Sequence, residues 1–399
     1  MKATAIPAAH RPAIRDVLEE HLEEMAFLWI QRRKLLFSTD VPLRRLPGHD
    51  ERIDAHCDGL VVGGRESVEV ALKRLDEEED PWVCAAELRT WLVIGAPDPA
   101  TALARFEAMP PELAPSWREA LRWCDAATIE RLFPPARATA LPPAAFALAV
   151  EALAWHQLLP APAAAHAARH ADAAVRASLA RTLGWAGMSE PAAEALGVLV
   201  DDAEPNVRRR ARLSAGLRDA VSLCDKLRRA RPGALEAFDL QLLGLFGDDQ
   251  DVKFLARAAE SEPLLDAGLR ALGDLGTDDA IETLLRVLAV PLEAAQLAAT
   301  LGLERALGPL AGEPGDDPKP APPADVREQW ETLRRSLPRG ARACYGKPRP
   351  WSGEQRDEPL FWRWRSGLVR PSAETRPLTR HVPDGFWDAA PSIVAEPGV

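Results

Sequence analysis

A leucine followed by a small residue recurs along this sequence at intervals of 29 or 30 residues, and this recurrence constrains the fold more than any other feature. The motif Leu-Gly-x-x-Gly occurs three times, at Leu183-Gly184, Leu243-Gly244 and Leu272-Gly273. A leucine followed by Ala, Ser or Gly continues the series at positions 153, 213 and 301. Internal periods of roughly 20–50 residues are typical of repeat architectures.

Each period has room for two helices. Asp172 precedes a helical series of apolar residues that ends at Leu183, and Glu190–Val200 can form a second helix. The small residue after each leucine permits either a close approach between helices or a left-handed C-cap. Antiparallel pairs stacked side by side bury one shared ridge of Leu and Ala, so each repeat needs its neighbours. We therefore predict an all-α fold in which residues 141–311 form an α-solenoid of ~30-residue helix pairs.

The chain on either side of this region has a different pattern. Residues 1–140 are predicted to form an N-terminal region of short helices, because apolar side chains recur at helical spacing over Ile14–Phe37 and no alternating strand pattern occurs. Asp50 is expected to cap the second of these helices. Residues 312–324 are rich in Pro and Gly and predict a linker. Residues 325–399 are predicted to contain a short helix, Asp325–Leu337, followed by an irregular tail.

The tail carries an unusual cluster of tryptophan and arginine, namely Trp362, Arg363, Trp364 and Arg365. The tail is rich in Pro and Arg, so we expect it to be ordered only in part. Two interpretations remain open. At least one Trp can fold back and cap the open end of the solenoid near Leu301–Leu310, as a terminal repeat requires. Alternatively, the cluster is a partner-contact site, because Trp and Arg most often anchor interfaces.

Two successive periods share an aspartate and a Val-Arg pair at matching positions, Asp172 with Val175-Arg176 and Asp202 with Val207-Arg208. These positions resemble those of short HEAT-like repeats of about 30 residues. The resemblance implies an Asp–Arg ladder that ties neighbouring repeats together. Later repeats lack the Val-Arg pair.

The N-terminal stretch carries a second, narrower resemblance. Its segments are Glu19–Glu24, Phe27–Trp29, Asp50–Arg52, Ala55-His56 and Asp58–Leu60. They are similar to the opening of an uncharacterised bacterial family that combines such an opening with a HEAT-like body and is often encoded near type VI secretion genes in Gram-negative bacteria. No catalytic residues are established for that family, so the resemblance implies none here.

Charge and motif content exclude several classes of protein. Sixty acidic residues against 49 basic ones give a net charge of −11, which argues against a phosphate-tracking nucleic-acid binder. The sequence contains no P-loop, no G-x-S-x-G, no H-E-x-x-H, no CxxC pair and no G-x-G-x-x-G. We therefore expect no nucleic-acid partner and no cofactor.

Histidines and cysteines offer only incomplete sites. His166 and His170 are four residues apart and could face one metal ion, but zinc would need two more ligands, so we expect no metal. His56 and Cys57 are adjacent on a predicted helix and therefore point about 100° apart. Cys344 has no histidine near it in sequence. Five widely spaced cysteines and the lack of a continuous apolar run predict a reduced, cytoplasmic protein without a signal peptide or membrane span.

Two classes of function follow from these observations. The leading hypothesis is a non-catalytic interaction protein whose solenoid binds another protein. The family resemblance implies a secretion effector or apparatus component as partner, bound by an adaptor, chaperone or immunity factor. The alternative is an enzyme on a HEAT-like scaffold, with lyase-like or base-excising activity. A pocket containing buried acids with raised pKa values would favour the enzyme, whereas a broad polar groove would favour the binder.

Overall fold

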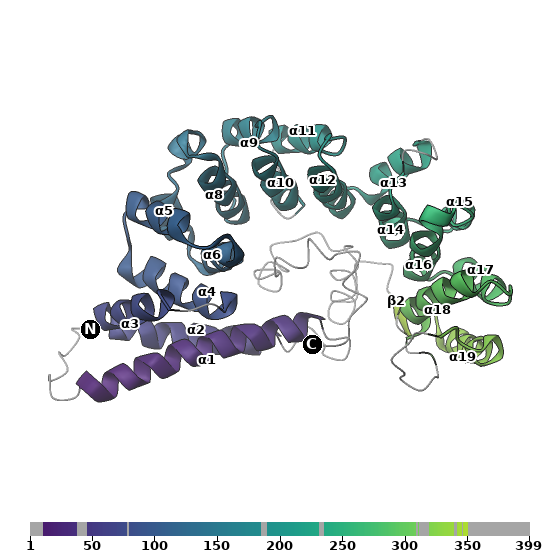
Figure 1. The fold of residues 1–399 in the computed structure, drawn as a ribbon, viewed down its shortest axis with the longest axis horizontal. Coiled ribbons are helices and arrows are strands. Elements are labelled where there is room, and N and C mark those ends of the chain that lie inside the picture. Colours follow the sequence, from purple (N-terminus) through teal and green to yellow (C-terminus); the bar gives the residue numbers. More distant parts are fainter. Residues whose placement is uncertain are drawn as a thin grey trace. The chain divides into compact units, whose positions relative to one another are not determined.

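The computed structural model describes residues 11–37, 46–77, 80–184, 190–230, 235–308, 310, 319–338, 341–344 and 346–349. Helices dominate these residues, which confirms the all-α prediction, and one two-stranded antiparallel ribbon accompanies them (Figure 1). The chain divides into two compact units between Ala211 and Arg212, inside a helix. No helix within the described ranges is long and apolar enough to cross a membrane.

The first unit is built from α-helices of 7 to 27 residues. Its α-helices are α1 (Arg11–Phe37), α2 (Leu46–Gly63), α3 (Arg65–Leu75), α4 (Pro81–Thr90), α5 (Pro99–Ala108), α6 (Ala114–Trp123), α7 (Ala126–Leu132), α8 (Pro143–Trp155), α9 (Ala161–Ala168), α10 (Ala173–Thr182) and α11 (Glu190–Leu199). A π-helical turn, η3 (Trp91–Gly95), and two 3₁₀ turns, η4 (Pro111–Leu113) and η5 (Pro135–Ala140), connect some of them. Helix α12 (Pro205–Arg218) crosses the boundary into the second unit.

The second unit continues with helices of similar length. They are α13 (Ala220–Arg229), α14 (Ala237–Phe246), α15 (Asp251–Ala258), the 3₁₀ turn η7 (Glu262–Leu264), α16 (Leu265–Leu275), α17 (Asp278–Leu288), α18 (Glu293–Leu307) and α19 (Pro323–Ser336). The ribbon consists of β1 (Arg342–Cys344) and β2 (Lys347–Arg349), with Ala343 opposite Pro348. Helix α19 agrees with the helix expected from the sequence over residues 325–337.

Several helices of the first unit begin at an aspartate that accepts backbone N–H groups. Asp80 accepts from the N–H groups of Trp82 and Val83, and Asp98 accepts from that of Thr101. Each of these two aspartates is followed by a proline, whose missing N–H costs nothing in the first turn. These helix starts follow directly from the sequence.

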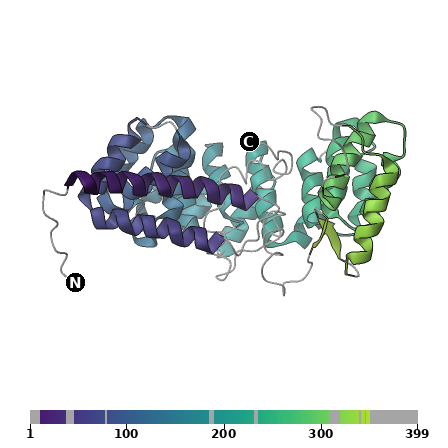
Figure 2. The ribbon, with the colours of Figure 1, turned by 90° about the horizontal axis from the view of Figure 1, so that it is seen from below.

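Helices α1 and α2 pack along each other and onto α4 (Figures 1 and 2). Their buried contact contains Leu22, Met25 and Ile53, and Trp29 meets Trp123 of α6 edge to face with ring centroids 5.1 Å apart. Leu22 and Trp29 of this core belong to the segments that carry the N-terminal resemblance, whereas Met25, Ile53 and Trp123 lie outside them.

Asp50 does not cap a helix, contrary to expectation. Helix α2 begins four residues earlier, at Leu46, so Asp50 lies inside it. Its carboxylate instead accepts a 2.5 Å hydrogen bond from Nε of Arg32, a side chain that is almost fully buried. A buried guanidinium needs such a charged partner, and this need explains the position of Asp50.

Glycine determines how closely α14, α16 and α18 approach. A Cβ on Gly244 would lie 2.5 Å from the carbonyl oxygen of Ala271, and a Cβ on Gly302 would lie 2.5 Å from that of Leu269. Gly273 lies still more tightly against the backbone of Gly302. Gly276 serves the other role, because it ends α16 in the left-handed conformation with φ of 63°. The two glycines of the Leu-Gly-x-x-Gly motif at Leu272 therefore have different functions.

The ribbon binds the carboxyl-terminal ends of three helices. Nη2 of Arg342 donates to the carbonyl of Gly247 after α14, at 2.8 Å. The N–H of Ala343 donates to Gly276 after α16 at 2.8 Å, and that of Gly346 donates to Ala306 in α18 at 3.0 Å. The last carbonyls of a helix lack hydrogen-bond donors within that helix, and the ribbon supplies such donors here. This part of the tail is therefore regular, which the sequence pattern did not predict.

Candidate functional site

The predicted partner-contact cluster of Trp362, Arg363, Trp364 and Arg365 lies outside the described residues. A different tryptophan lies buried near the end of the second unit. Trp330 of α19 is fully buried, and its indole N–H donates to Glu282 of α17 at 3.2 Å. Helix α19 packs on both α17 and α18. Trp330 therefore covers these helices in the way that the sequence suggested for Trp362 or Trp364.

The repeat leucines lie in the interior. The side chains of Leu183, Leu243 and Leu272 are at most 1% exposed, and Gly184 is buried beside the first of them. Gly244 and Gly273 contact neighbouring helix backbones, as described above. These six positions stabilise the fold, and none of them offers a surface to a partner.

Arg176 connects two successive loops through several hydrogen bonds. Its Nε and Nη2 donate to the carboxylate of Asp202 at 2.8 and 3.0 Å, and its Nη1 donates to the carbonyls of His170 and Ala171. The hydrogen bonds from Arg176 lower the pKa of the Asp202 carboxyl below its ordinary value. Bidentate pairs of this kind are the strong, geometrically specific ones. The Arg176–Asp202 pair is the contact that the HEAT-like resemblance implies.

The next arginine of the series repeats part of this geometry. Nη1 of Arg208 donates to the carbonyls of Asp202 and Ala203, just as Arg176 donates to its own preceding loop. Both aspartates also cap backbone N–H groups, since Asp172 accepts from Ala174 and Asp202 accepts from Glu204. The equivalence of the two loops supports a structural role for all four positions.

Further Arg–carboxylate pairs join elements at similar sequence separations but were not predicted. They are Arg212 with Asp239, Arg228 with Asp251, and Arg305 with Asp274. The partners are 27, 23 and 31 residues apart. The signal that could have found them is this near-period spacing between an arginine and an aspartate. The Val-Arg pattern alone misses them, because they use different positions in the helices.

A buried charged cluster joins α6, α8 and α10 in the first unit. Oε1 of Glu151 accepts a 2.5 Å hydrogen bond from Nη2 of Arg181 and a 2.7 Å hydrogen bond from Oγ of Ser178. Nε of Arg118 lies 3.9 Å from the other carboxylate oxygen. Glu151 and Arg181 are 30 residues apart, which is one period of the repeat. A carboxylate held in this way by an arginine is an acceptor that bridges helices, and it is poorly placed to serve as a general base.

His166 and His170, the pair considered as metal ligands, pack against each other and an aromatic ring. The two rings meet edge to face with centroids 5.5 Å apart, and both pack against Phe146. Nδ1 of His170 accepts the backbone N–H of Asp172 at 3.1 Å. In the described part of the chain, no three His, Cys, Asp or Glu side chains converge as metal ligands. These histidines therefore contribute to packing and to the loop before α10.

His56 and Cys57 point to different partners. Sγ of Cys57 lies 3.1 Å from Sδ of Met25 in the core, whereas Nδ1 of His56 lies 3.0 Å from Nδ1 of His21 on α1. Burial raises the pKa values of the Cys124 and Cys224 thiols to about 12, so neither is a thiolate at neutral pH. These two thiols are therefore not activated nucleophiles.

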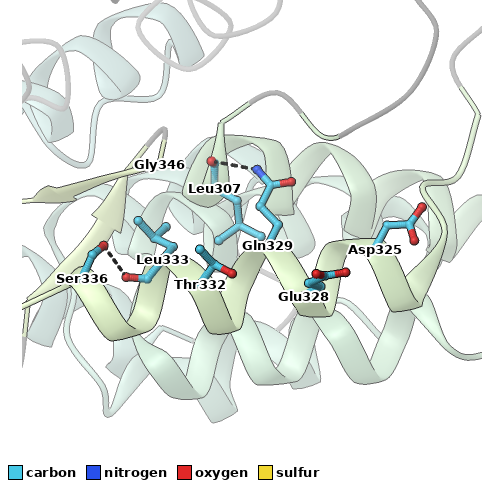
Figure 3. Close-up of a pocket in the computed structure, with 8 residues that line it drawn as sticks. All are labelled: Leu307, Asp325, Glu328, Gln329, Thr332, Leu333, Ser336 and Gly346. Atoms are coloured by element: carbon cyan, nitrogen blue, oxygen red, sulfur yellow. Dashed lines mark hydrogen bonds between the residues drawn. The ribbon is translucent and has the colours of Figure 1, made fainter.

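An open groove of about 650 Å³ follows one side of α19 in the second unit (Figure 3). Eight described residues line it, namely Leu307, Asp325, Glu328, Gln329, Thr332, Leu333, Ser336 and Gly346. Figure 3 shows most of them along α19, with Leu307 from the end of α18. Sequence reasoning did not single out this groove, because its walls come from the helix after the linker, the end of α18 and the ribbon turn.

Five of the eight residues that line the groove are polar, and two of them donate hydrogen bonds to backbone carbonyls of the lining. Nε2 of Gln329 donates to the carbonyl of Leu307 at 3.3 Å, and Oγ of Ser336 donates to the carbonyl of Leu333 at 2.7 Å (Figure 3). Asp325 and Glu328 are exposed carboxylates. The eight lining residues include neither a histidine nor a cysteine to pair with the Ser336 hydroxyl. Burial raises the pKa of Glu304, but this acid is not one of them. This set of side chains suits binding better than catalysis.

No protein-family profile matches the chain. No curated protein matches it with a significant score.

Proposed function

We propose that this chain is a non-catalytic interaction protein in which HEAT-like helix pairs of ~30 residues form an α-solenoid that binds another protein. Helix packing supports the repeat arrangement. Helix α8 packs against α10, α14 against α16, and α16 against α18, so alternate helices are neighbours. Helix α17 contacts both α16 and α18. Alternate helices pack in this order when antiparallel pairs stack side by side.

The residue contacts support the same arrangement. The Arg176–Asp202 pair joins loops one period apart, and Glu151 joins Arg181 across exactly 30 residues. Gly244 and Gly273, one period apart, provide equivalent close approaches, because each meets the backbone of the next alternate helix. Polar ties and small residues at one period are what a repeat array requires, because each repeat buries its faces on its neighbours.

The observation that carries the binding function is the groove along α19. It is open and mixed in polarity, and its described walls hold no nucleophile paired with a base and no set of metal ligands. Extended or open surfaces of this kind are used by repeat proteins to hold partners. The enzyme alternative has no comparable support, because the acid whose pKa burial raises, Glu304, is not a lining residue.

The N-terminal resemblance suggests the partner. Residues from three of its segments, Leu22, Trp29 and Leu60, meet in one core. If the resemblance extends to function, the protein is an adaptor, chaperone or immunity factor for a type VI secretion effector or apparatus component.

Co-expression with the products of neighbouring genes tests this proposal. Each neighbour is produced together with the full chain, and the mixture is analysed by gel filtration and isothermal titration calorimetry. We expect one neighbour to co-elute and to bind with a defined stoichiometry. Products of an unrelated locus serve as controls. Failure of every neighbour to bind would remove the secretion assignment, and turnover of a small substrate by the pure chain would favour the enzyme.

A further inference from the structure

We propose that the groove along α19 binds a positively charged, amphipathic segment of the partner protein. This inference rests on the proposed function and adds the chemistry of the bound segment. The groove has a volume of about 650 Å³, which lies in the range of roughly 300–1,000 Å³ found for ligand clefts. It can therefore accept several side chains of a peptide segment.

One face of α19 is turned to the groove. Asp325, Glu328, Thr332 and Ser336 follow one another at intervals of three or four residues, the spacing of neighbours on a single helix face. All four are exposed. A partner segment that lies along this face would meet the two carboxylates first and the two hydroxyl groups one to two turns later.

The groove carries negative charge. Two of its eight described lining residues are acidic, and none is basic. Helix α18 ends beside the groove at Leu307, and the carboxyl end of a helix adds partial negative charge. A Lys or Arg side chain would be attracted there, whereas an acidic segment would be repelled.

Two of the three basic residues of α19 lie on a different side and are paired, whereas the third, Arg335, donates to the backbone carbonyl of Glu331 and is not a lining residue. Arg327 contacts Glu282, and Arg334 contacts Asp278, both on α17. These pairs hold two positive charges of α19 against α17, and Asp325 and Glu328 are the charged groups among the described lining residues. This negative lining is the reason for choosing a basic occupant over an acidic one.

The groove also needs an apolar contact. Leu333 is half-buried and lies beside Leu307 in the lining (Figure 3). An aliphatic side chain of the partner would cover Leu333 and remove its remaining surface from water. The expected segment therefore combines Lys or Arg with at least one aliphatic residue.

Selection from a phage-displayed library of random 16-residue peptides tests the proposal with the full chain as target. Enriched peptides are synthesised with a fluorescent label, and their affinity is measured by anisotropy. We expect peptides of net positive charge with at least one Leu, Ile or Val. Their affinity should fall as NaCl is raised from about 50 to about 500 mM, because exposed charges are screened over about 3–10 Å in this range.

Charge reversal on α19 locates the binding site. Asp325→Lys combined with Glu328→Lys should weaken binding at least about tenfold, and Glu328→Lys alone should weaken it by a smaller factor. Glu331→Lys is the matched control, because Glu331 is exposed on the same helix but is not a lining residue. It should change the affinity less than about twofold. Circular dichroism and thermal melts check that each variant is folded.

The outcomes separate this inference from the proposed function. If the selected peptides are neutral or acidic, or if they bind the double variant and wild type equally, the groove assignment is wrong even where protein binding persists. Self-association of the full chain that Glu328→Lys abolishes would assign the groove to a second copy and would also overturn the inference. If no peptide is enriched and no neighbouring gene product binds, the proposed function fails with it.

Discussion

Replacing Gly244 with alanine tests the close approach of α14 and α16. The new Cβ would lie 2.5 Å from the carbonyl oxygen and 2.8 Å from Cα of Ala271, whereas ordinary contact begins near 3.4 Å. Both obstructing atoms belong to the backbone, so no flexible side chain can move aside. Overpacking of this kind costs about 1–3 kcal/mol, against a gain in helix propensity of about 0.5–1 kcal/mol.

We expect the free energy of unfolding to fall by about 2 kcal/mol, because the clash is at the severe end of that range. A unit of 150–250 residues loses about 2–4 °C in Tm per kcal/mol, so the second unit should melt about 4–8 °C lower. Differential scanning calorimetry is the appropriate assay, since a chain with two compact units can show more than one transition.

Gly197→Ala is the matched control for this substitution. Gly197 lies in α11, and a Cβ there would meet nothing within 4 Å. The same added methyl group should therefore leave Tm unchanged or raise it slightly through better helix propensity. If Gly244→Ala melts at or above the wild-type temperature, as the control should, α14 and α16 do not pack as closely as described and the reasoning is refuted.

Three further predictions concern the core, the end of the second unit and pH. Leu243→Asp should unfold or aggregate the protein, because an unpaired carboxylate at a fully buried position costs several kcal/mol; an unchanged melting temperature would contradict this. Trp330→Ala should cost about 3–5 kcal/mol and lower the Tm of the second unit, and an unaltered calorimetric trace would show that Trp330 does not anchor α19. Burial and the neighbouring His21 lower the pKa of His56 from its ordinary value of 6.5, so below that pH the unfolded state binds more protons than the folded state. The free energy of unfolding should therefore fall as the pH drops from about 7 to 5. His56→Gln should reduce this change with pH in urea titrations, and an equal change would exclude His56 as its source.

The interior of the repeat region could be predicted from the sequence, because its determinants are periodic. Leu243 and Leu272 were placed in the core from their spacing, and both are fully buried. The two roles predicted for the small residues, close helix approach and C-capping, both occur. The sequence could not show which glycine has which role. Gly273 serves helix approach and Gly276 serves the C-cap, and this assignment depends on which residue meets the next helix.

The ribbon and the groove could not be predicted, because neither has a periodic signal. Strands β1 and β2 contain three residues each, too few to show an alternating pattern. Their position depends on carbonyls at Gly247 and Gly276, which are 66 or more residues earlier in the chain. The groove combines Asp325 on one helix with Leu307 on another, and only the packing of α18 and α19 brings them together.

The central claim, that this chain functions by binding another protein, is tested most directly by native mass spectrometry of the endogenous protein. The full chain is tagged at its chromosomal locus, purified in one step under non-denaturing conditions and weighed intact. The account predicts a species heavier than the 43.5 kDa chain by the mass of one bound partner, with both subunits identified after dissociation in the gas phase. A spectrum containing only the 43.5 kDa chain, or whole-number multiples of that mass, would contradict the claim.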